Sequence, residues 1–124
     1  MSIAVALEHL KAEAEKMRPS PYFLSASDDG RPHAVLVRIE WVGNALVFGA
    51  GNRSKLNVAA RPRVSLLFPP REDGGYSLII DGDATIGDNN QISIHPTRGV
   101  LHRPAAPSNM PKEGCGADCV PILG

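Results

Sequence analysis

The chain has 124 residues, enough for one globular domain with little room for a second. Hydrophobic residues make up 43% and charged residues 21%, which is the balance of a folded chain and excludes a wholly disordered one. Thirteen basic and thirteen acidic side chains cancel, so the chain as a whole does not attract nucleic acids or anionic membranes. Any binding site for an anion must therefore be local.

The first segment has the pattern of an amphipathic helix. Apolar residues recur at helical spacing over 3–17, Ser2 is a suitable N-cap, and Pro19 and Pro21 end the pattern. Charged residues interrupt 1–16, so this segment lacks the apolar run of a signal peptide, and no later stretch is long enough to cross a bilayer. We expect a cytoplasmic protein without nucleic-acid or membrane partners.

Short strand patterns separated by tight turns follow the helix. They cover 22–26, 33–41, 45–48, 64–68 and 77–86, with a last strand within 92–101 that is interrupted or bent at Pro96. A short helix is expected over 54–60, and Gly82 indicates a bulge or a sharp bend within its strand. The regular spacing of the turns predicts antiparallel pairing in a mainly β (α+β) barrel or sandwich.

The best candidate for binding chemistry is the loop and helix start that begins at Asn52. A helix N-terminus offers unpaired N–H groups and a partial positive charge. Ser54 adds a hydroxyl group, and Arg53 and Lys55 add two cations, so the segment is equipped to bind a phosphate. The flanking Gly49 and Gly51 let a ligand approach the backbone closely. The alternative is a solvated connection in which Ser54 only caps its own helix.

Several segments follow the order and spacing of the flavin domain of the pyridoxamine 5'-phosphate oxidase family. They are Pro32-His33-Ala34-Val35-Leu36-Val37-Arg38, Leu46-Val47-Phe48, Arg53-Ser54-Lys55, Arg61-Pro62-Arg63-Val64-Ser65-Leu66-Leu67-Phe68-Pro69 and Asp81-Gly82-Asp83-Ala84. The chain therefore resembles this family over roughly 22–86. The resemblance implies a six-stranded antiparallel split β-barrel, with an N-terminal helix and a short helix between strands, that binds flavin mononucleotide (FMN) as a homodimer.

The resemblance also implies a set of cofactor-binding residues. In the family, FMN lies at the dimer interface, with its isoalloxazine ring along a strand edge and its phosphate held by cationic side chains. The matching positions here are His33, Ala34, Val35, Leu36, Val37, Arg38, Gly49, Ala50, Arg53, Ser54, Lys55 and Ser77. Arg53 and Lys55 would hold the phosphate, and Ser77 would reach the flavin, in the family often from the partner subunit.

Two departures from the family pattern bear on function. His33 stands where the oxidases proper have an arginine, and the chain is too short to contain their C-terminal dimerisation segment with its substrate-binding residues. The resemblance therefore carries over the fold and the flavin site but not the pyridoxine-pathway activity. Arg38 would bind an anionic group of a substrate or ligand through a bidentate contact, or would form an ion pair with Glu40 or another strand neighbour.

We expect a flavin-binding domain over 1–104 and an extended tail over 105–124. The tail is rich in proline and glycine, yet Val120, Ile122 and Leu123 are apolar, so we expect it to lie over the barrel or a partner subunit. Cys115 and Cys119 could form half of a zinc site or a redox disulfide, but two unremarkable thiols are the simpler interpretation, and no metal site is predicted.

No nucleophile-base-acid triad and no pair of catalytic carboxylates is evident, so no catalytic residue is assigned. Any reactivity must then come from the cofactor. The sequence therefore favours an FMN-dependent oxidoreductase that acts by hydride transfer on an unidentified small substrate. The alternatives are a flavin-binding or sensing module without turnover, and the same barrel with a deazaflavin coenzyme or a haem, for which His33, His95 and His102 are the candidate axial ligands.

Overall fold

A computed structural model describes residues 1–105 of the chain. The predictions made for Cys115, Cys119 and the docking of 120–123 lie outside the described residues. None of the helices in this part of the chain has the length and apolar character needed to cross a membrane.

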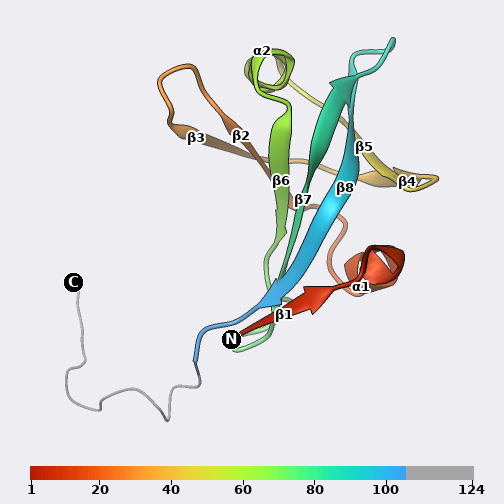
Figure 1. Cartoon of the computed structure of the whole chain (residues 1–124), viewed down its shortest axis with the longest axis vertical. Helices are drawn as coiled ribbons and strands as arrows, with labels where there is room; N and C mark the ends of the chain where they lie inside the picture. Colours follow the sequence, from red (N-terminus) through yellow and green to blue (C-terminus); the bar gives the residue numbers. More distant parts are fainter. Residues whose placement is uncertain (106–124) are drawn as a thin grey trace.

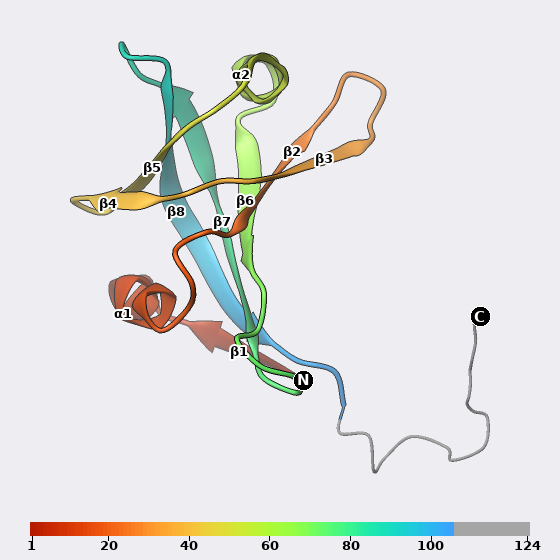
Figure 2. The same cartoon turned by 180° about the vertical axis from the view of Figure 1, so that it is seen from behind.

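The described residues form one antiparallel sheet that coils into a split barrel. Its strands are β1 (Ser2–Val5), β2 (Tyr22–Ala26), β3 (Pro32–Leu36), β4 (Glu40–Val42), β5 (Ala45–Gly49), β6 (Arg63–Phe68), β7 (Ser77–Ile86) and β8 (Gln91–His102). They lie in the order β3-β2-β6-β7-β8-β5-β4, and β1 pairs with the other part of β8. The chain from β3 to β4 crosses the sheet and joins its two outermost strands (Figure 1, Figure 2). The mainly β fold class predicted from the sequence is confirmed.

The barrel interior is filled by alternate side chains of each strand. In β6, for example, Val64, Leu66 and Phe68 are buried, as expected for a strand with one face on the core. The rings of Phe23 and Phe48 meet at its centre, with 4.9 Å between their centroids. The core therefore depends on residues from both ends of the strand order.

Gly82 marks the predicted bulge. The register between β7 and β8 shifts between Asp81, which faces Arg98, and Gly82, which faces Pro96. A Cβ atom at position 82 would lie 2.6 Å from the carbonyl oxygen of His95, so only glycine fits where the two strands approach this closely. The bulge also lets β8 continue past Pro96 as one strand.

The N-terminal segment differs from the prediction. Instead of one helix over 3–17 capped by Ser2, it forms β1, a 3₁₀ turn (Leu7–His9) and the shorter helix α1 (Leu10–Glu15). Residues 2–5 pair with 99–102 of β8, whose backbone would otherwise form a free edge there. A helical apolar pattern cannot reveal a partner strand so far away in the sequence. The helix that does form covers the barrel with Leu10 and Ala14, which are buried.

The strand predicted over 33–41 is divided into β3 and β4. Between them, the N–H of Val37 donates to the carbonyl of Pro21 at 3.0 Å, and the N–H of Ile39 donates to that of Pro19 at 3.1 Å. These bonds hold 37–39 against the segment that leads into β2. This division and the added β1 account for eight strands where six were predicted.

Candidate functional site

The helix α2 (Asn52–Ala60) begins two residues before the predicted start at Ser54. Its N-cap is Gly51, which contributes no side-chain bond, so Ser54 does not cap the helix. The first hydrogen bond of the helix joins the N–H of Lys55 to the carbonyl of Gly51 at 3.1 Å. The N–H groups of the three preceding residues therefore lie outside the helical ladder and remain donors for a ligand.

The start of α2 faces β3 across a hollow of about 310 Å³, here called the β3–α2 hollow. Its lining comes from β3 and the residue after it, from the end of β5 and from the first turn of α2. Eight of the twelve predicted cofactor-binding residues line it: His33, Val35, Leu36, Val37, Gly49, Ala50, Arg53 and Ser54. Two segments that are separate in the sequence thus line one hollow.

The lining of the β3–α2 hollow combines apolar and polar residues. Val35, Val37, Gly49 and Ala50 are apolar or small, whereas His33 and the residues at the start of α2, Asn52, Arg53 and Ser54, are polar or cationic. This arrangement suits an elongated ligand with an apolar body and an anionic end.

Four of the predicted residues do not line this hollow. Ala34 and Arg38 are exposed, because they alternate with the inward-facing residues of their segment. Arg38 forms no ion pair with Glu40 in the described structure. Lys55 is half-buried one position beyond the lining, and Ser77 pairs with His102 at the start of β7.

Gly51 and Asn52 also line the hollow. Both belong to the loop and helix start that the sequence singled out, although neither was among the twelve predicted cofactor-binding residues. Both are set by the early start of α2. An Asn-Arg-Ser run directly after a glycine is compatible with a helix that starts at Asn52, and this run is the sequence signal for the earlier helix start.

A second hollow, here called the hairpin hollow, lies between the β2–β3 turn and the start of α2. Its volume is about 450 Å³, and it includes Asp28, Asp29 and Arg31 of the turn. His33 and Arg53 line both hollows, so the two meet at this pair. The Nδ1 atom of His33 is buried without a hydrogen-bond partner. An unpaired buried nitrogen costs free energy that a ligand with a suitable hydrogen-bonding group could recover.

Hydrogen bonds fasten α2 to the β2–β3 hairpin. The side-chain amide of Asn57 donates to the hydroxyl of Ser25 at 3.0 Å, and both residues are buried. Arg61 donates through Nε to the carbonyl of Ala26 at 2.7 Å and through Nη2 to the carboxylate of Asp28 at 2.8 Å. These contacts fix the separation of α2 from β3, and hence the width of the site between them.

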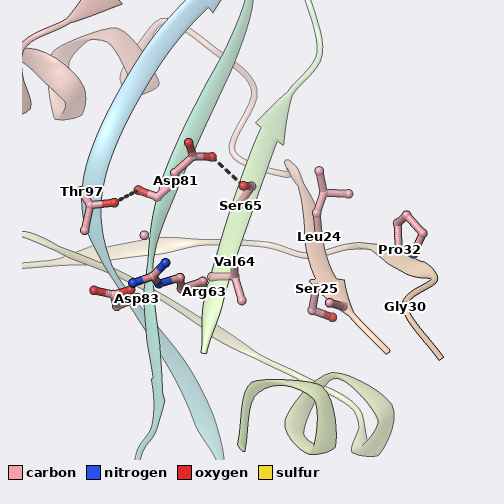
Figure 3. Close-up of a pocket in the computed structure, with 12 residues that line it drawn as sticks. Leu24, Ser25, Gly30, Pro32, Arg63, Val64, Ser65, Asp81, Asp83 and Thr97 are labelled. Carbon is pink, nitrogen blue, oxygen red and sulfur yellow. Dashed lines mark hydrogen bonds between the residues drawn. The ribbon is translucent and has the colours of Figure 1, made fainter. Parts of the chain in front are cut away.

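A larger hollow, of about 680 Å³, lies across β2, β6 and β7 and includes none of the predicted site residues. Figure 3 shows the hydroxyl of Ser65 donating to the carboxylate of Asp81 at 2.6 Å and that of Thr97 donating to its carbonyl at 3.3 Å. Arg98 lies 3.5 Å from the same carboxylate. The β3–α2 hollow, which brings together eight of the predicted residues, is the stronger candidate site. The described residues contain no cluster of metal-binding side chains.

Comparison with known proteins identifies relatives of the chain. Uncharacterized proteins of Mycobacterium bovis and Mycobacterium tuberculosis are each 36% identical to the chain over 121 residues, covering 82% of it and 84% of each relative. The chain belongs to their family. No protein-family model matches it.

Solved structures show which fold this family has. A pyridoxamine 5'-phosphate oxidase-like protein of Listeria innocua has a TM-score of 0.58 at 17% identity, with 74% of this chain and 92% of that one covered. A FAD-binding protein of Mycobacterium smegmatis has a TM-score of 0.59 at 14% identity, covering 83% and 100%. An F420 reductase has a TM-score of 0.58 at 16% identity, covering 70% and 94%. The chain has the pyridoxamine 5'-phosphate oxidase-like split-barrel fold, as predicted.

Proposed function

We propose that the β3–α2 hollow binds FMN and that the protein is a flavin-dependent oxidoreductase acting on a small substrate by hydride transfer. The observation that supports this most is the lining of the hollow, which combines the apolar Val35 and Val37 with the cationic Arg53 at the start of α2. A cytoplasmic location belongs to the same proposal. Structural neighbours named for FAD and for F420 support a flavin-type cofactor for this fold.

The polar lining at the start of α2 suits the phosphate. The free N–H groups at the start of α2, the hydroxyl of Ser54 and the guanidinium of Arg53 are all donors to an anion. Lys55 is close enough in sequence to add a second cation from the same helical turn. His33 would contribute a ring N–H where the oxidases proper have an arginine.

The apolar part of the lining suits a planar ring. Val35 and Val37 contribute aliphatic groups, and a Cβ atom at Gly49 would meet nothing within 4 Å, so the hollow is open beside Gly49. A bound flavin would supply the hydride chemistry. The residues of the chain would bind and orient it, and would exclude water from one face of the ring.

We include a homodimer in this proposal because an apolar row crosses the outer face of the sheet. Leu36, Tyr22, Leu67, Ile79 and Val100 are successive cross-strand neighbours, and each is exposed or half-buried. Cross-strand partners share a face of the sheet, so this row is continuous. A second copy on this face would cover it and could bring its own Ser77 or Arg38 toward the flavin.

Sedimentation velocity tests the dimer. We expect a dimer at micromolar concentration, and we expect Tyr22→Arg to shift the protein toward monomer, because it places a charge in the apolar row. The control is Val42→Arg, which changes an exposed apolar residue of β4 outside the row. A monomeric wild-type protein at this concentration would contradict the proposal.

The absorbance spectrum of the purified protein identifies the cofactor class, since flavin, deazaflavin and haem have different bands. FMN titration into Arg53→Ala and Lys55→Ala then tests the phosphate contacts. We expect each variant to lose about 1.5–3 kcal/mol of binding free energy, roughly ten- to a hundredfold in affinity. Lys11→Ala, an exposed change on α1, is the control. Unchanged affinity in both variants would place the phosphate elsewhere.

Anaerobic addition of NADH or NADPH separates an oxidoreductase from a binding module. We expect the flavin absorbance to bleach during reduction and to recover when oxygen is admitted. A bound flavin that neither nucleotide reduces would favour a flavin store or sensor.

A further inference from the structure

We propose that His33 takes up a proton when the site binds a phosphate monoester, so that the affinity for FMN rises as the solution becomes more acidic. The inference rests on the proposed function, because it takes the β3–α2 hollow as the flavin site. What it adds is a proton, carried by the imidazole of His33, as a third component of the complex.

The first argument is the hydrogen bonding of the His33 ring. His33 is half-buried in β3, and its cross-strand neighbour in β2 is Ser25. The hydroxyl of Ser25 already accepts a hydrogen bond from the side chain of Asn57, whereas the Nδ1 atom of His33 is buried and has no partner in the described structure. Because an unpaired buried nitrogen costs free energy, a ligand atom that bonds to Nδ1 is favoured.

The second argument is the position of this ring relative to the proposed phosphate. His33 and Arg53 line both the β3–α2 hollow and the hairpin hollow, so an anion held at this junction lies beside the imidazole. A fully ionised phosphate has only acceptor oxygens, so its bond to the ring requires an N–H donor. A neutral imidazole offers that donor in one tautomer and without charge. The cationic imidazole offers it with a full charge, which makes the bond about twice as strong.

The third argument is the charge that the phosphate brings to the β3–α2 hollow. A phosphate monoester carries about 1.5 to 2 negative charges near neutral pH. Arg53 is the one permanent cation among the lining residues, and it forms no ion pair within the described part of the chain. Lys55 lies outside the lining, and Gly49 and Ala50 beside β5 carry no charge. A protonated His33 therefore brings the charge at the phosphate close to neutral.

The β2–β3 turn presents the other charged groups near the ring. Asp28, Asp29 and Arg31 share the hairpin hollow with His33. Asp28 is paired with Arg61 at 2.8 Å, and Asp29 is paired with Arg31 at 3.4 Å. Each of these carboxylates already has a cationic partner, so the phosphate is the anion that favours the protonated ring. Proton uptake is thus coupled to phosphate binding.

Calorimetric titration of the full chain with FMN counts the protons directly, when it is carried out in two buffers that differ in ionisation enthalpy. At about pH 7.5 the phosphate of free FMN has already lost its second proton. A histidine side chain with an ordinary environment is mostly neutral at that pH, so we expect uptake of about 0.5–1 proton for each FMN bound. Uptake below about 0.2 proton would overturn the inference, since histidine is the side chain that gains a proton in this range.

The pH profile of binding assigns this proton to His33. We expect the wild-type affinity for FMN to increase by about fivefold or more between about pH 8 and about pH 6.5. His33→Arg has a permanent cation, so its affinity should change by less than about twofold over this range. His33→Gln is neutral throughout, so it should be equally insensitive to pH and about fivefold weaker than the wild-type protein at about pH 6.5. His9→Gln removes an exposed histidine of the 3₁₀ turn and should keep the wild-type profile.

The outcomes separate the inference from the proposed function. If FMN binds to the wild-type protein with an affinity that does not depend on pH, the inference is wrong and the proposed function stands. Proton uptake that persists in His33→Gln would assign the proton to the phosphate itself and would have the same meaning. The calorimetric count for the wild-type protein decides the question even if neither His33 variant folds. If FMN binds at no pH, the proposed function itself is wrong, and the inference with it.

Discussion

Two regions of the sheet are built in contrasting ways. β7 and β8 have ten and twelve residues, pair with each other along their length apart from one bulge, and have further strands on their other sides. β3 has five residues, pairs only with β2, and has no fully buried residue. The long strands therefore bring most of the interstrand contacts, while the edge strand leaves one side open for a ligand.

The contrast teaches where rigidity is needed for binding. β3 has little packing of its own, so its distance from α2 depends on the bonds that fasten α2 to β2, through Asn57 and Arg61. Changes in the β7–β8 region should therefore reduce the free energy of unfolding and leave affinity intact. Changes in the fastening contacts should reduce both.

The largest expected effect is in the β7–β8 region. Ile94 is fully buried in β8, so Ile94→Ala should lower the free energy of unfolding by about 2–5 kcal/mol, because it removes apolar contacts and leaves a cavity. Chemical denaturation measures this, and flavin affinity under folding conditions should not change. Val42→Ala, at a side chain that is 61% exposed, is the control. If the two variants lose similar stability, the β7–β8 region does not have the role given to it here.

The bulge gives the next largest effect. Gly82→Ala should cost about 1–3 kcal/mol, because the added methyl group meets the backbone of His95 and the side chain of Ile94. Gly87→Ala is the matched control, since its Cβ would make only an ordinary contact at 3.5 Å with Asn89. Thermal unfolding of both variants is sufficient, and equal melting temperatures would show that the strands can separate at the bulge without cost.

The hydrogen bonds that fasten α2 to β2 test the second half of the comparison, in which a loss of stability is accompanied by a loss of affinity. Asn57→Ala should cost about 1–2 kcal/mol of stability, because it leaves the buried Ser25 hydroxyl without its partner. It should also weaken flavin binding, because the start of α2 is no longer held at its distance from β3. The double variant with Ser25→Ala should lose less stability than the sum of the single variants. Additive losses would mean that the two side chains do not interact energetically.

The smallest effect should come from α1. Lys16 and Glu13 form an exposed i,i+3 ion pair at 3.2 Å, so Lys16→Ala should change stability by no more than about 0.5 kcal/mol and leave flavin affinity unchanged. Urea denaturation at low and at high salt provides the measurement. A loss above about 1 kcal/mol would indicate that α1 contributes more to stability than its two buried residues, Leu10 and Ala14, suggest.

Local patterns predicted the elements that are defined by their own residues. Tyr22–Ala26 and Ser77–Ile86 match the predicted strands in both bounds, because alternation and flanking turns specify them. The bulge at Gly82 was also predicted, since a glycine inside a strong strand has few other uses. The site residues came instead from the family resemblance, and eight of the twelve line one hollow in the structure.

Contacts between distant segments could not be predicted in this way. Residues 2–5 become a strand only because 99–102 lie beside them, and their own apolar spacing fits a helix. β3 ends at Leu36 because Pro19 and Pro21 supply carbonyls to the next residues. The hairpin hollow depends on a turn and a helix that are more than twenty positions apart, so no local motif marks it.

The pairing of β1 with β8 has a consequence for the order of events during folding. Ser2 contacts His102 across 100 positions of sequence, and the N-terminal amine of Met1 donates to the carbonyl of Arg103 at 2.9 Å. Closing a loop of this length costs chain entropy before the stabilising contacts between β1 and β8 can form, so this pairing should form late. During synthesis, β1 leaves the ribosome long before the residues of β8 that pair with it, and is thus among the last strands to pair. Until the final residues of β8 arrive, that strand remains an unpaired edge open to other chains.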